Sequence, residues 1–152
     1  MKIVAPVFNN ALALRNPVVG DSDASQGNYD SVIAVPDLVA AVIATYIGAD
    51  QDNINARGVD VVVDVTAVGG LTPQVIVTIE GKDPRSGKYY PLLASAALVA
   101  AGTVVLTVYP GATVAANIAV SRQLPRTWRA KAVVSGGAGA TITATVSASV
   151  VL

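Results

Sequence analysis

The sequence predicts an all-β fold, a single antiparallel β-sandwich or barrel-like domain with an extended N-terminal arm. Apolar β-branched residues alternate with polar residues over several short segments, which is the period of half-buried strands. Gly, Pro, Asn and Asp residues separate these segments, and no strong helical period interrupts the series. We therefore expect an arm over residues 1–30 and a β domain over residues 31–152.

The composition is that of a folded chain with few charges. Hydrophobic residues make up 53% of the 152 residues and charged residues only 13%, which excludes a disordered chain. So small a fraction of charged residues indicates that partner subunits cover part of the surface. Ten basic and ten acidic residues give a net charge of zero, which argues against nucleic-acid binding through phosphate neutralisation. We expect a homo-oligomer and no nucleic-acid partner.

Cysteine and histidine are both absent. This excludes disulfides and thiolate metal sites, and it removes the usual general base and the commonest metal ligand. The longest uncharged run, residues 89–121, is interrupted by Pro and Gly and is rich in Val and Thr, so we expect strands there and no membrane span. We expect no catalytic residue, no cofactor, no metal site and no membrane partner.

Residues 1–30 differ in pattern from the rest of the chain. Polar and turn-forming residues dominate positions 15–30, and the apolar residues before them have neither a helical nor a strand period. At about 3.3 Å per residue the arm can reach up to roughly 100 Å. We expect a partner to order it, with a floppy terminus as the alternative. The apolar candidates for a capsid-binding arm are Ile3, Val4, Val7, Phe8, Leu12 and Leu14.

The β domain opens with two expected strands and a polar loop. Residues 31–35 favour a strand that ends at Pro36, and residues 41–47 favour a second one, although Asp37 could instead cap a helix. The loop over residues 49–58 has the wrong Asp and Asn spacing for a calcium loop. We interpret it as a connection, with a weak cation site as the alternative.

The stretch from Gly58 to Tyr90 is the expected centre of the sheet. Valines alternate with aspartates over residues 59–65, and a second alternating run covers residues 74–80. The Gly69-Gly70 break indicates a reversal between these runs, and residues 81–87 form a second turn. The pattern predicts a β-meander whose third strand starts near Tyr89.

The second half of the chain predicts further strands over residues 89–94, 103–109, 126–134 and 140–151. Residues 95–102 join the first two of these, with a short helical turn as the alternative, and residues 112–121 form a short helix or a loop. The last strand is expected to have one apolar face and one Thr/Ser face. Trp128 occupies an inward position between Arg126 and Arg129. We interpret Trp128 as a core residue, and a stacking platform for a base or sugar is the alternative.

Several segments together resemble a family of small tailed-bacteriophage virion proteins. They are ADQDNINARGVDVVVDVTAV, VTIEGKDPRSGKYYPLLAS, TVVLTVYPG and LPRTWRAKAVV. The resemblance covers the chain from about Ala49 to its C-terminus, and it implies a virion component without enzymatic activity. An arm joined to a compact β domain further resembles the capsid decoration, or cement, proteins.

This resemblance implies a protein that is made in the host cytoplasm and then binds the outer surface of the phage head. It would act as a homotrimer that contacts the major capsid protein and stabilises the shell. A tail or neck component is the second interpretation. A carbohydrate-binding β-sandwich that uses Trp128 and the tyrosines is the third, and an enzyme is the least favoured.

Overall fold

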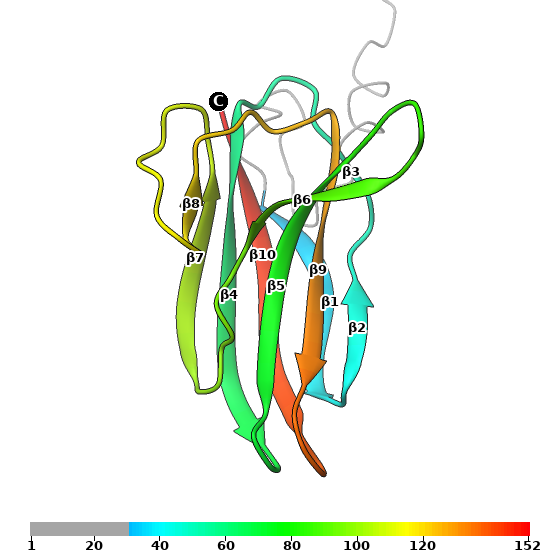
Figure 1. Cartoon of the computed structure of the whole chain (residues 1–152), viewed down its shortest axis with the longest axis vertical. Coiled ribbons are helices and arrows are strands. Elements are labelled where there is room, and N and C mark those ends of the chain that lie inside the picture. Colours follow the sequence, from blue (N-terminus) through cyan, green and yellow to red (C-terminus); the bar gives the residue numbers. More distant parts are fainter. Residues whose placement is uncertain (1–30) are drawn as a thin grey trace, which may run out of the picture.

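The computed structural model describes residues 31–152 and confirms the all-β fold (Figure 1). The first sheet has the order β1-β10-β4-β7-β8, and the second has the order β2-β9-β5-β6 with β3 also paired to β9. Their inner faces share one apolar core, as in a β-sandwich. The described residues form no helix, and so none that is long and apolar enough to cross a membrane.

The strands are short to medium in length and all pairs but one are antiparallel, the exception being β7 with β8. They are β1 (Ser31–Ala41), β2 (Ala44–Ile47), β3 (Gln51–Asp52), β4 (Gly58–Gly69), β5 (Gln74–Lys82), β6 (Tyr89–Ala94), β7 (Gly102–Val108), β8 (Ala119–Val120), β9 (Thr127–Ser135) and β10 (Thr141–Val151).

Alternation along the strands decides which side chains enter the core. Every second residue of β4 from Val59 to Val65 is buried, as is every second residue of β9 from Trp128 to Val134. In β10 the residues Ile142, Ala144, Val146 and Ala148 are buried, while the Thr and Ser residues between them face outward. The predicted faces of these three strands are therefore confirmed.

The predicted meander is wrong at its first turn. β4 pairs with β10 and β7, whereas β5 pairs with β9 and β6, so the Gly69-Gly70 break carries the chain from one sheet to the other. Gly70 has φ of 80°, and a Cβ atom there would lie 2.1 Å from the carbonyl oxygen of Gly139 in the neighbouring β9–β10 connection. Only the β5–β6 hairpin of the meander is confirmed.

The first two strands also differ from expectation. β1 does not end at Pro36 but continues to Ala41, because its register against β10 shifts by one residue at three successive steps. Such bulges accommodate a proline on an edge strand. β2 starts at Ala44, three residues later than expected, because residues 41–44 form the corner between the two sheets.

The two connections with helical alternatives contain no helix. Residues 95–101 run beside β5, where Val75 and Leu98 exchange backbone hydrogen bonds. Residues 109–118 form a loop that leads into β8, and the Asn117 side chain donates to the Ala94 carbonyl at 3.1 Å. The helix alternative for residues 112–121 is therefore wrong, and the loop alternative holds except at Ala119–Val120, which form β8.

Candidate functional surfaces

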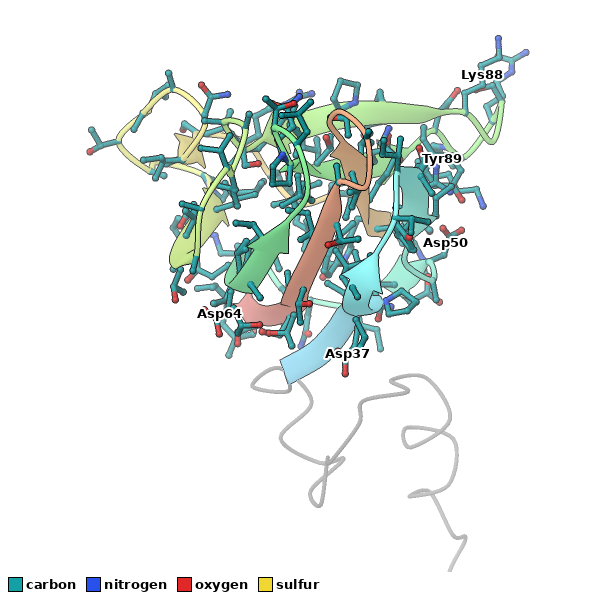
Figure 2. The ribbon with its side chains drawn as sticks, turned by 90° about the horizontal axis from the view of Figure 1, so that it is seen from below. Asp37, Asp50, Asp64, Lys88 and Tyr89 are labelled. Carbon is teal, nitrogen blue, oxygen red and sulfur yellow. The ribbon has the colours of Figure 1, made fainter. Side chains whose placement is uncertain are left out.

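A charged cluster covers the outer face of the second sheet, where β5, β6 and β9 meet the start of β3. The Tyr89 ring lies between two cations, with the Arg129 guanidinium carbon 3.3 Å from its centroid and the Lys82 Nζ atom 5.2 Å away. The Tyr89 hydroxyl donates to Asp50 Oδ1 at 2.6 Å, and Lys82 donates to Asp50 Oδ2 at 2.8 Å. Figure 2 shows Asp50 and Tyr89 together at one side of the molecule. The cluster holds the β5–β6 hairpin against the polar loop.

Glu80 is the acid at the centre of this sheet face, and its side chain is only 7% exposed. It accepts from Arg129 Nε at 2.9 Å and from Lys131 Nζ at 2.5 Å. Burial by itself raises the pKa of Glu80, but the hydrogen bonds and charges of Lys131 and Arg129 outweigh it and hold the pKa below its ordinary value. The pKa of Asp50 is lowered in the same way, against its own burial, by Lys82 and Tyr89.

These contacts leave the cluster with a structural role. Arg129 joins its two halves, since it binds Glu80 and also stacks on Tyr89. Both acids are held ionised by basic partners, which is unsuited to a general acid or base near neutral pH. Across residues 31–152 there is no group of three or more His, Cys, Asp or Glu side chains placed to hold a metal ion.

The outer face of the first sheet is polar and hydrogen-bonded along its strands. Asp60 and Asp64 of β4 accept hydrogen bonds from the hydroxyls of Thr107 at 2.7 Å and Thr103 at 2.8 Å, both on β7. The Thr and Ser residues of β10 continue the same face on the other side of β4. This face therefore presents hydroxyl groups and two aspartates that accept hydrogen bonds from them.

A shallow depression of about 310 Å³ lies beside the polar loop. Its residues come from two connections and are Asn53, Ile54, Asn55, Ala56, Arg57, Gln123, Leu124 and Arg126. The Asn53 amide donates to the carbonyls of Ala56 and Leu124, and its oxygen accepts from the Ala56 N–H. Asn53 therefore serves the loop itself, which supports the interpretation of residues 49–58 as a connection.

Trp128 belongs to the core, as expected. It is 1% exposed and sits among buried residues of both sheets. A ring so covered cannot stack on a sugar or a base, so the part of the carbohydrate interpretation that uses Trp128 is wrong. Two of the tyrosines in the described part of the chain are stacked by the protein's own arginines, since Arg57 lies over Tyr109 and Arg122 lies over Tyr90.

Sequence reasoning missed the charged cluster. The signal was present in part, because Glu80 and Arg129 both occupy outward positions of alternating strands. It becomes visible only when β5 is paired with β9, which places Glu80 directly opposite Arg129.

The six apolar arm residues lie outside the described residues. They are Ile3, Val4, Val7, Phe8, Leu12 and Leu14. No family model, no curated protein and no solved structure matches the chain.

Exposed aliphatic side chains are the surface feature that the chain's own packing leaves unexplained. Among residues 34–152, whose burial is described, twelve large hydrophobic side chains are exposed, and Val39, Val114 and Leu71 are the most exposed at 77%, 69% and 62%. Exposed aliphatic side chains that gather in one place mark a site of contact with a partner. The best candidate functional feature is therefore a set of docking surfaces.

Proposed function

We propose that this chain is a non-enzymatic structural protein of a bacteriophage virion. In this proposal it decorates the outer surface of the head as a homotrimer that contacts the major capsid protein. The observation that carries the proposal is the combination of exposed aliphatic side chains with acids that are paired to the protein's own bases and hydroxyls. The assignment to a phage particle comes from the resemblance of several segments to small tailed-bacteriophage virion proteins.

The proposed mechanism is burial of surface across the joints between capsid subunits. Each large aliphatic side chain that becomes buried contributes roughly 1.5–3 kcal/mol before ordering costs. A protein that binds only the assembled shell stabilises that shell by mass action. The sandwich suits this role because its core and its charged cluster hold the surface in one shape, which lowers the entropy cost of docking.

The arm supplies a second means of attachment in this proposal. β1 begins at Ser31, opposite Ser149 of β10, so the arm joins the sandwich beside the last strand. Its apolar residues need cover, and a neighbouring capsid subunit would provide it. Burial of several such anchors can exceed the cost of ordering the segment.

Deletion of residues 1–14 tests the role of the arm. We expect the shortened protein to leave the head and the heads to burst at a lower temperature, while the thermal unfolding midpoint of the isolated protein stays unchanged. The measurements are occupancy on purified heads and the two thermal transitions. A full-length variant with six Ser substitutions in residues 15–30 is the matched control and should retain occupancy.

Full occupancy and unchanged head stability after the deletion would contradict attachment through the arm. That result would leave the β domain as the attachment surface. A lower unfolding midpoint of the isolated protein would instead show that the arm packs on its own domain.

A further inference from the structure

The strand registers bring four connections to one end of the sandwich. Ala41 pairs with Ile142, Gly69 with Thr141, Gln74 with Ser135, and Val65 with Gly102. The β1–β2, β4–β5, β6–β7 and β9–β10 connections therefore lie together, at the bottom of Figure 1. We call this surface the uncharged end and define it as residues 39–45, 66–74, 95–103 and 134–142.

No residue of the uncharged end is charged. Six of the twelve exposed large aliphatic side chains belong to it, and they are Val39, Val42, Ile43, Val68, Leu71 and Val99. Figure 2 looks onto this end, and the labelled Asp37 and Asp64 lie toward its edge. The opposite end holds the β5–β6 turn, Arg57 and Arg126.

The uncharged end is held in place by contacts between its own connections. Leu71 donates its N–H to the Ala138 carbonyl at 3.2 Å and accepts from the Gly137 N–H at 2.7 Å. A Cβ atom at Gly137 would lie 3.0 Å from the Leu71 side chain, so Leu71 rests directly on this turn while 62% of it stays exposed. A surface fixed in this way loses little conformational freedom when a partner docks.

Charge restricts the partner. A charged group buried against this end would find no opposite charge, and an unpaired buried charge costs several kcal/mol. The partner surface must therefore be uncharged and apolar as well. The absence of basic residues disfavours an anionic membrane surface. The same end of a second copy meets the requirement, and it brings no like charges together.

The estimated area of the uncharged end is large enough for a contact between two copies of the chain. Four strands of the first sheet and three of the second reach this end, where residues 95–101 continue β6 alongside β5. With strands about 4.8 Å apart and sheets about 10 Å apart, the end presents roughly 500 Å² per copy once outward side chains are included. Two such ends would bury roughly 1,000 Å² in total, the lower bound for a specific interface.

We propose that the uncharged end is a self-association surface, which docks against the same end of a second copy of this chain. A contact between two like ends closes as a two-fold dimer, so this proposal concerns a contact separate from the homotrimer of the proposed function. It is tested without a virion, so a failure here leaves the head attachment of the proposed function standing.

The test is sedimentation velocity of the full chain from about 1 to 200 µM, a range that spans micromolar dissociation constants. We expect reversible association that changes less than about twofold between low and high salt, because no charges meet in the contact. Val42→Asp and Val99→Asp should each weaken association by at least tenfold. Val114→Asp is the matched control, equally exposed but in the β7–β8 loop outside the uncharged end, and should change it less than twofold.

Circular dichroism melting of each variant shows whether it is folded, and Val42→Ser and Val99→Ser provide milder substitutions if an aspartate prevents folding. A full chain that stays monomeric over the whole range overturns the proposal. So does association that Val42→Asp and Val99→Asp leave intact, or that only Val114→Asp disrupts. Loss of association on deletion of residues 1–14 would also overturn it, since the arm would then be the occupant of this end.

Discussion

Glu80 connects two bases on the outer face of the second sheet. Its side chain is 7% exposed and binds Arg129 and Lys131 of the neighbouring strand. Because these contacts hold the pKa of Glu80 below its ordinary value, the folded state binds this proton more weakly than the unfolded chain does. The contribution of Glu80 to the free energy of unfolding is therefore full above its unfolded pKa and is lost as pH falls through the folded pKa.

We predict that Glu80→Gln lowers the free energy of unfolding by about 2 kcal/mol at neutral pH, the range for a lost hydrogen bond to a charged group. The difference from the parent protein should shrink as the pH falls below about 4.3, the ordinary pKa of a glutamate, because the unfolded chain then takes up the proton first and the folded carboxylate follows at lower pH. Urea unfolding of the variant and of the parent protein at a series of pH values measures this difference.

Asp52→Asn is the matched control, because Asp52 is exposed and lies near the same sheet. It should change the free energy of unfolding by less than about 0.5 kcal/mol at all pH values. A Glu80→Gln penalty that stays constant down to the lowest pH would contradict the assigned role of the ionised carboxylate.

At the scale of the element, the alternation of single strands was predictable and their partners were not. The period of two in β4 and β10 predicts which side chains are buried, because adjacent residues of a strand point to opposite faces. It carries no information about which strand lies alongside. A Gly-Gly break looks the same whether the chain turns within a sheet or crosses between sheets, and the misplacement of the Gly69-Gly70 turn followed from this.

The charged cluster was hidden for the same reason. Asp50 and Tyr89 are far apart in the sequence and meet only because the polar loop passes beside the β5–β6 hairpin. Trp128, by contrast, was placed correctly, because an inward position on an alternating strand is decided locally. Local periodicity therefore predicted the core, while the surface features depend on long-range pairing.

Gly48 lies where the two sheets come together. Its N–H donates to the Ala130 carbonyl of β9 at 2.9 Å, and a Cβ atom there would lie 1.7 Å from the Ala34 carbonyl oxygen of β1. We predict that Gly48→Ala lowers the free energy of unfolding by about 3 kcal/mol, because backbone atoms must separate to admit the methyl group. Urea or thermal unfolding measures the effect.

Gly87→Ala is the control for this substitution. Gly87 has φ of 70° in the β5–β6 turn, and nothing lies within 4 Å of the position of its Cβ atom. Its cost should be only the backbone strain of about 1 kcal/mol. If Gly48→Ala proves no more destabilising than Gly87→Ala, the close approach of β1 at this corner is not a constraint on the fold.

At the scale of the whole molecule, the two proposed contacts lie at opposite ends. The arm joins β1 at Ser31, and the uncharged end begins after Leu38 of the same strand. At about 3.3 Å per residue, a separation of roughly 25–30 Å follows from the length of this strand. Changes at sites this far apart add in free energy when they share no partner. Arm deletion and the uncharged-end substitutions should therefore act on different observables, head occupancy for the one and self-association for the other.

Cryo-electron microscopy of the phage particles that carry this protein is the sharpest test of the proposed head decoration. We expect density for the sandwich on the outer surface of the head, three copies around each local three-fold position, with arm density running onto neighbouring capsid subunits. Density in the tail or neck, or particles that lack the protein, would contradict it.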